Sequence, residues 1–221
     1  MVHIRTDREI SLISASCQIV ADTLNMLSEH VRPGIKIIDL DQMAEEFILS
    51  KGARPAFKGY MGFPSTLCVS VDDEVVHGIP SDKFLEDGQI VGIDCGAEKE
   101  GYYGDHAITF SVGNVSESRQ KLMKTTKDCL TKGIAEAKPG NYVSDIGYAI
   151  QSHAEKNGYS VVRELVGHGI GSNLHEEPQI PNYGNPKQGY KLCEGMCIAI
   201  EPMINMGNKE VVTDADGWTI R

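Results

Sequence analysis

The sequence predicts an α+β fold made of two similar halves, and three observations lead to this prediction. Apolar residues recur with helical spacing in several segments, and short segments rich in β-forming residues lie between them. Features of the first half also recur in the second half. With 221 residues, of which 41% are hydrophobic, the chain is long enough to bury a core of this kind.

The first helix is predicted to begin at a capping box, Thr6-Asp7-Arg8-Glu9. It has one apolar face, formed by Ile10, Ile13, Cys17, Val20, Leu24, Leu27 and Val31. A second helix is expected after Pro33-Gly34 and before Gly52, with an apolar face of Leu40, Met43, Ala44, Phe47 and Ile48. Strands are expected at about 66–72, 89–95 and 104–112.

The second half repeats this order. Pro139-Gly140 follows Pro33-Gly34 by 106 residues (139 − 33), and an amphipathic helix again comes next. "LEDGQIVGIDCG" from Leu85 matches "LCEGMCIAIEPM" from Leu192, which aligns Asp94 with Glu201. We therefore predict two helix-helix-strand-strand halves, about 1–114 and 115–221, forming one curved sheet covered by four helices. Because no linker separates the halves, residues 1–221 are expected to form a single domain.

Composition narrows the class of protein. Acidic residues outnumber basic ones by 31 to 21, so we expect no direct nucleic-acid binding. The six cysteines include no C-x-x-C pair, and five of them lie in apolar or periodic segments, which indicates core thiols in a reducing compartment. Early charges and the lack of a long apolar run disfavour secretion and membrane insertion. The expected location is the cytoplasm.

Two acids lie in a segment that otherwise resembles a buried hairpin. With a turn near residues 99 and 100, Asp94 and Asp105 would face each other directly, with Cβ atoms roughly 4.5–5.5 Å apart, and their charges would repel. One acid could instead cap backbone donors while the other faces water, or the two could share a proton. A metal site is favoured because Glu201 lies on the matching strand and His168 and His175 precede it. Paired ions bridged by one carboxylate would fit this set.

Five groups of residues occur in a fixed order along the chain. They are "HGIP" at 77–80, "IDCG" at 93–96, "GDHA" at 104–107, "GHGIG" at 167–171 with "HEEP" at 175–178, and "IEPM" at 200–203. In this order they resemble the type I methionine aminopeptidases, which are metallopeptidases of the pita-bread fold. The resemblance covers nearly the whole chain. It implies removal of the initiator methionine from nascent proteins whose second residue is small.

The resemblance also implies roles for single residues. Asp94 would bind one divalent ion, Asp105 would bridge two, and His168 with Glu201 would hold the other; the ions would be Co, Mn, Fe or Zn. Glu201 would also move the proton of the attacking water. His77 and His175 would contact the substrate and stabilise charge on its carbonyl. The methionine pocket would be formed by Tyr60, Phe63, Cys68 and Trp218, although each of these residues taken alone would more often be part of the core.

The pattern breaks near its end. The family's last metal ligand is a glutamate that follows "DGWT", and no such glutamate occurs in the 221 residues. We expect a chain truncated at the C-terminus that lacks the family's final strands. The expected partners are the N-termini of nascent polypeptides at the ribosome, and the expected state is a monomer. The alternative is a non-catalytic homologue that binds nascent chains or ribosomes.

Overall fold

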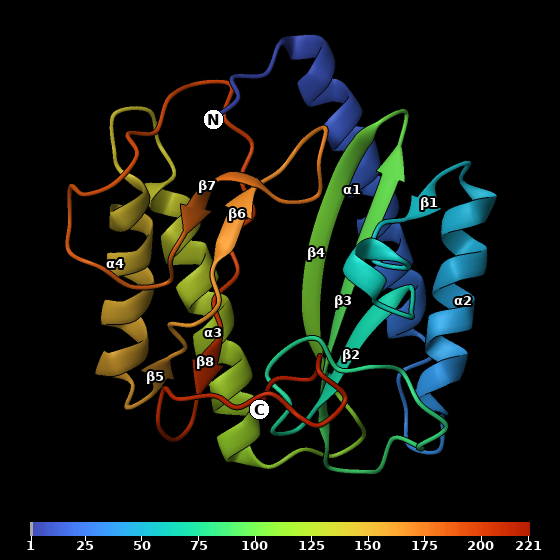
Figure 1. Ribbon diagram of the computed structural model, residues 1–221. Helices are drawn as coiled ribbons and strands as arrows, with labels where there is room; N and C mark the ends of the chain where they lie inside the picture. Colours follow the sequence, from blue (N-terminus) through green and yellow to red (C-terminus); the bar gives the residue numbers. More distant parts are fainter. Residues whose placement is uncertain (1) are drawn as a thin grey trace. The chain divides into compact units, whose positions relative to one another are not determined.

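The computed structural model describes residues 2–221 (Figure 1). Its elements confirm the α+β prediction with four long helices. They are α1 (Asp7–Ser28), α2 (Ile37–Ser50), β1 (Arg54–Pro55), the short 3-10 helix η1 (Tyr60–Gly62), β2 (Leu67–Val71), β3 (Ile90–Lys99), β4 (Tyr102–Ser111), α3 (Glu117–Glu136), α4 (Val143–Lys156), β5 (Ser160–Val161), β6 (Gly167–Gly169), β7 (Glu176–Ile180) and β8 (Ile204–Asn205).

The chain divides into two compact units, which are described separately. Unit 1 contains residues 2–10, 120–171 and 175–211. Unit 2 contains residues 11–119, 172–174 and 212–221. Residues 2–10 therefore belong to the unit that contains α4 and most of α3, and residues 212–221 belong to the unit that contains α2 and most of α1.

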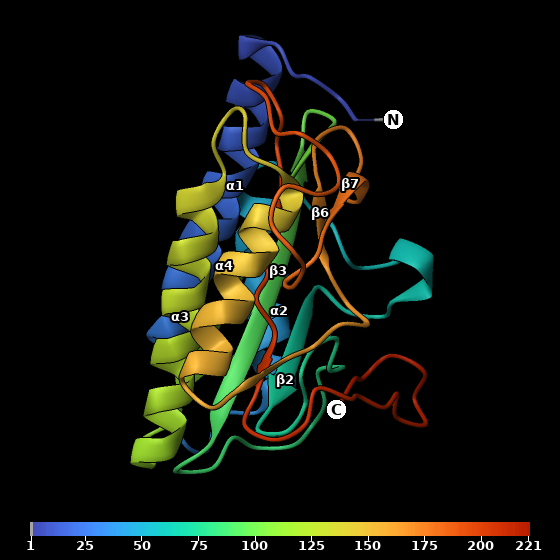
Figure 2. The same ribbon diagram turned by 90° about the vertical axis from the view of Figure 1, so that its left-hand side faces the viewer.

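Unit 2 is built on a four-stranded antiparallel sheet. Strand β3 is paired with β1, β2 and β4. Every second side chain of β3 points to the same face of the sheet, and on one face Ile93, Cys95 and Ala97 are fully buried. Helices α1 and α2 cover this face (Figures 1 and 2), and their apolar residues join the same core. The opposite face of β3 carries Asp94.

Helix α1 begins as predicted. The N–H of Thr6 donates to Glu9 Oε2 at 2.9 Å, and the N–H of Glu9 donates to Thr6 Oγ1 at 3.4 Å, which completes the capping box. The predicted apolar face is partly wrong, because Cys17 is exposed and Ser16 is fully buried. The Ser16 hydroxyl is satisfied inside the core, since it donates to the carbonyl of Tyr102 at 2.8 Å.

By length and composition alone, helix α1 is long and apolar enough to cross a membrane, so the expectation that the chain has no long apolar segment was wrong. Its residues Val20, Leu24 and Leu27 are fully buried in the core of unit 2. The same composition is found in core helices. All six cysteines lie among the described residues and are free thiols. Cys68, Cys95 and Cys129 are buried, as predicted for core cysteines, whereas Cys17 and Cys193 are exposed and Cys197 is half-buried.

Unit 1 pairs α3 and α4 with short strands. Its core includes Cys129, Ile146, Ile150 and Ile180, all fully buried. Strand β6 is paired with β7, and β5 is paired with β8. The segment around Glu201 was predicted as a regular strand equivalent to β3. It is instead an extended segment that exchanges backbone hydrogen bonds between Ala199 and His168, at 2.7 and 3.2 Å, before the short β8.

Candidate functional site

The β3–β4 hairpin places the two predicted acids on one face of the unit 2 sheet, although not directly opposite each other. Asp94 is paired with Ala107, and Asp105 is paired with Gly96. The turn residues are Glu100 and Gly101, both with positive φ (53° and 81°), so the register differs by two residues from the predicted one. The expectation of direct opposition is therefore wrong. Asp94 and Asp105 are diagonal neighbours, a relation in which Cα atoms lie roughly 7–8 Å apart.

Cys68 lies on the same face as these acids, because β2 pairs it with Asp94. Its side chain is buried. Burial raises the pKa of the Cys68 thiol well above its usual range, and the negative charges of Asp94 and Asp105 raise it further. Cys68 is therefore a neutral thiol beside two carboxylates, which suits an apolar pocket wall better than a nucleophile.

His77 lies in the loop that follows β2 and has a φ of 60°, which is unusual for a residue other than glycine. Burial lowers the pKa of its imidazole, and the charge of Asp105 partly offsets this effect. The next residue must be glycine, since a Cβ on Gly78 would lie 2.2 Å from the carbonyl oxygen of Val69. Left-handed conformations of this kind persist where the surroundings impose them, often at functional sites.

Two of the four predicted pocket residues are in direct contact. The rings of Phe63 and Trp218 meet edge to face, with centroids 5.1 Å apart and planes at 75°. Phe63 is buried and Tyr60, on η1, is 37% exposed. Cys68 lies on β2 beside Asp94, as described above.

In unit 1, His168 and Glu201 face each other. Nδ1 of His168 lies 2.8 Å from the carbonyl oxygen of Gly169, and because a carbonyl only accepts, Nδ1 must carry the proton. Nε2, which bears the lone pair in the neutral ring, lies 3.2 Å from Glu201 Oε1. Two acceptors at this distance require a cation or a proton between them. The ring of His175 meets that of His168 edge to face, with centroids 4.3 Å apart.

Three further residues near this pair form buried contacts that were not predicted. The side-chain amide of Asn182, which is fully buried, donates to the backbone carbonyl of Glu201 at 2.7 Å. Next to His175, the carboxylate of Glu176 forms a buried ion pair with Arg5. Glu176 lies inside the "HEEP" motif, so the motif could have indicated that Glu176 is a candidate site residue. Nothing in the local sequence indicates that Arg5 is its partner.

The metal ligands predicted from the sequence are divided between the two units, Asp94 and Asp105 in unit 2 and His168 and Glu201 in unit 1. Among residues 2–221, no group of three or more His, Cys, Asp and Glu side chains is placed so that it could hold an ion. The donor types do fit, because carboxylate oxygens and a neutral imidazole suit first-row divalent ions. His168 also donates its other ring N–H to a backbone carbonyl, the arrangement usual for metal-binding histidines.

Comparison with known proteins identifies the family. Residues 11–221 match metallopeptidase family M24. The chain is 50% identical to methionine aminopeptidase 1 of Bacillus subtilis over 220 residues, which is 100% of this chain and 89% of the relative.

Solved structures agree with this assignment. The crystal structure of methionine aminopeptidase from Rickettsia prowazekii has a TM-score of 0.98 and 42% identity, over 100% of this chain and 89% of that one. Prolidase from Pyrococcus furiosus has a TM-score of 0.78 and 27% identity, over 90% of this chain and 57% of that one. These matches confirm the predicted pita-bread fold. The chain belongs to metallopeptidase family M24, and within it to the methionine aminopeptidases.

Proposed function

We propose that this protein is a divalent-metal-dependent aminopeptidase that removes the initiator methionine from polypeptides whose second residue is small. The relatives at 50% and 42% identity carry the name methionine aminopeptidase and are matched along nearly their whole length, which supports the same reaction here. We also propose that residues 1–221 act as one catalytic domain, because the proposed ligands come from both halves of the sequence.

The observation that carries the proposal is the pair formed by His168 and Glu201. Nδ1 of the imidazole is engaged by a backbone carbonyl, so Nε2 is the ring nitrogen that faces a carboxylate oxygen 3.2 Å away. When the ring is neutral, Nε2 is an acceptor like the carboxylate oxygen, and a cation between them would join the two groups. A divalent ion would accept electron density from both groups.

The proposed ligands are Asp94, Asp105, His168 and Glu201, holding two ions drawn from Co, Mn, Fe and Zn. Bound ions would polarise the scissile carbonyl and make water more acidic. Glu201 would accept a proton from the attacking water and deliver it to the leaving amine. His77 and His175 would donate hydrogen bonds to the peptide and stabilise the negative charge that develops on its carbonyl oxygen.

The methionine side chain would lie against Tyr60, Phe63, Cys68 and Trp218. The edge-to-face contact of Phe63 with Trp218 supports an aromatic wall. A thioether gains about 0.3–1.5 kcal/mol from each contact with an aromatic ring. The neutral thiol of Cys68 adds a small polarisable surface without charge.

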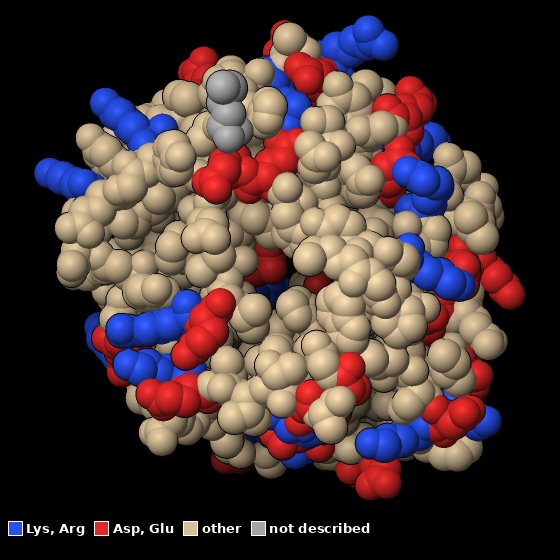
Figure 3. Space-filling view, in the orientation of Figure 1, with Lys and Arg blue, Asp and Glu red and all other residues tan. Residues whose placement is uncertain are grey.

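In the cell the substrates would be the N-termini of nascent polypeptides at the ribosome, and the enzyme would act as a cytoplasmic monomer. Direct nucleic-acid binding is not part of the proposal. Lys and Arg side chains are interspersed with Asp and Glu on the face seen in Figure 3, and the formal net charge is −10. Such a surface does not attract a phosphate backbone.

The proposal is tested by peptide cleavage and by elemental analysis of the same preparation. We expect release of methionine from Met-Ala-Ser to be far faster than from Met-Leu-Ser, and stoichiometric divalent metal in the protein. Glu201→Gln should lower kcat by about 100-fold or more, as loss of a general base does. Protein that contains no metal and cleaves neither peptide would instead support the non-catalytic homologue.

A further inference from the structure

The segment Val212–Arg221 of unit 2 is attached to the loop that carries His77. The N–H of Val75 donates to the carbonyl of Ile220 at 2.7 Å, and the N–H of Ile220 donates to the carbonyl of Val76 at 3.0 Å. The segment also folds back on itself, because Val212 and Arg221 exchange backbone hydrogen bonds at 2.7 and 2.9 Å. Residues 72–77 and 212–221 therefore form one paired structure.

Asp216 shapes the turn from which Trp218 extends. Its Oδ1 accepts the N–H groups of Trp218 and Thr219, both at 2.8 Å, and its Oδ2 accepts the Thr219 hydroxyl at 2.6 Å. These bonds lower the pKa of the Asp216 carboxyl, so the acceptor stays ionised at neutral pH. The backbone at Trp218 is fixed by this turn, and its ring lies against Phe63.

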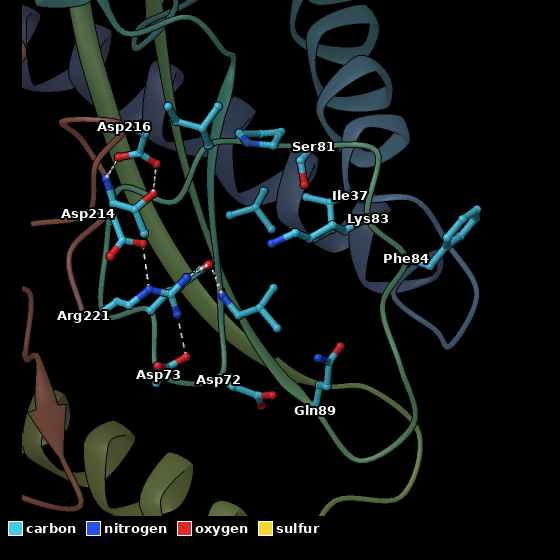
Figure 4. A pocket seen from close by; sticks show the side chains of 16 residues that line it. Ile37, Asp72, Asp73, Ser81, Lys83, Phe84, Gln89, Asp214, Asp216 and Arg221 are labelled. Carbon is cyan, nitrogen blue, oxygen red and sulfur yellow. Dashed lines mark hydrogen bonds and ion pairs between the residues drawn. The ribbon is translucent and has the colours of Figure 1, made fainter.

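Arg221 joins the turn to the loop through three carboxylates (Figure 4). Its Nη1 lies 2.7 Å from Asp73, its Nη2 lies 2.8 Å from Glu74, and its Nε lies 2.7 Å from Asp214. Glu74 is only 17% exposed, and its second oxygen accepts the N–H of Val71 at the end of β2 at 2.8 Å. The guanidinium therefore connects the sheet edge, the His77 loop and the Trp218 turn.

This arrangement differs from an ordinary surface ion pair. An isolated exposed pair contributes little to stability because water screens it and two long side chains lose freedom. Here all three nitrogens of one planar guanidinium lie at hydrogen-bond distance from carboxylates. The pKa of the Arg221 guanidinium is raised, mainly by its hydrogen bond to Asp214. A lysine ammonium is a compact point charge and does not reproduce this planar fork.

We propose that Arg221 is a positioning residue for substrate recognition: it holds the Trp218 turn and the strained His77 loop in place without touching the substrate. The identity of the substrate rests on the proposed function, whereas the mechanical role does not. Without the guanidinium, the three carboxylates would lose their shared partner and repel one another. The turn would then open more often, and Trp218 would leave Phe63.

The sole tryptophan of the chain makes this testable without activity. In Arg221→Gln we expect the acrylamide quenching constant of Trp218 to rise at least about twofold, because local opening exposes the ring. The quenching constant of Arg221→Lys should lie between those of Arg221→Gln and the unchanged protein. The matched control is Lys124→Gln, which removes the cation of an exposed ion pair with Asp128 in unit 1 and should leave quenching unchanged.

A second variant covers the case in which Arg221→Gln fails to fold. Asp73→Asn removes the negative charge of one of the three partners at an exposed position, which weakens that contact, and should give a smaller rise in quenching with unchanged circular dichroism. Unchanged quenching in Asp73→Asn and in any folded Arg221 variant would overturn the proposal.

In Met-Ala-Ser cleavage, Arg221→Gln should lower kcat/KM about tenfold through poorer positioning, with metal content unchanged. If the unchanged protein shows no cleavage at all, the proposed function fails while the quenching result still decides the role of Arg221.

Discussion

The packing of β4 against α1 allows the effect of one added methyl group to be worked out. A Cβ on Gly104 would lie 2.4 Å from the backbone nitrogen of Cys17, 2.6 Å from the carbonyl carbon of Ser16 and 2.7 Å from the Cα of Cys17. Non-bonded carbon contacts are normally about 3.5–4.0 Å, so Gly104→Ala must move the strand or the helix by about 1 Å. Neither neighbour is a flexible side chain that could turn away.

We expect Gly104→Ala to lower the free energy of unfolding by about 1–3 kcal/mol, the usual cost of overpacking. For a chain of this length, this corresponds to a Tm lower by roughly 2–12 °C, measured by circular dichroism. Asp105 is the next residue, so the affinity for added Mn²⁺ should fall as well.

The control is Gly207→Ala, where an added Cβ meets nothing within 4 Å and φ is ordinary. It should leave the Tm within about 2 °C, or raise it slightly, because alanine reduces the freedom of the unfolded chain. Equal Tm values for Gly104→Ala and Gly207→Ala would contradict the close approach of β4 to α1.

Three further predictions concern other contacts. Arg5→Met leaves the Glu176 carboxylate buried without its guanidinium, which should cost about 3–5 kcal/mol and lower the Tm by roughly 6–20 °C; a change below about 2 °C would contradict the buried pair. A double-mutant cycle with Phe63→Leu and Trp218→Leu should give a coupling of about 0.5–1.5 kcal/mol in unfolding, and a zero coupling would exclude the ring contact. Burial raises the pKa of Asp41, so the folded state binds more protons between its unfolded and folded pKa values, and the free energy of unfolding falls as the pH rises through that window. Asp41→Asn, which lacks this titration, should therefore gain in Tm relative to the unchanged protein as the pH rises above about 4, the ordinary pKa of an aspartate, and a constant difference would refute the assignment.

Local rules predicted most of the elements. The capping box at Thr6 and Glu9 formed as expected because it needs only four consecutive residues. The hairpin strands were also found, but their register was not. Gly101 adopts a positive φ at no steric cost, and the turn is formed by Glu100 and Gly101. The register of β3 and β4 therefore differs by two residues from the predicted one.

Contacts between distant segments could not be predicted from patterns. Ser16 is buried because its hydroxyl reaches the carbonyl of Tyr102, so a search for apolar residues passes over it. The Arg5 and Glu176 side chains are 171 residues apart in sequence, and neither position alone indicates a buried pair. Trp218 was predicted from its motif, whereas the partners of Arg221 depend on how two loops pair.

The most direct test of the account is the rate of methionine release from Met-Ala-Ser by protein stripped of metal with a chelator, before and after Mn²⁺ or Co²⁺ is added. We predict no measurable release from the stripped protein and recovery of activity with the added ion, because in the proposed mechanism the carboxylates and His168 act through bound cations. Equal release from the stripped and the reloaded protein would contradict the account.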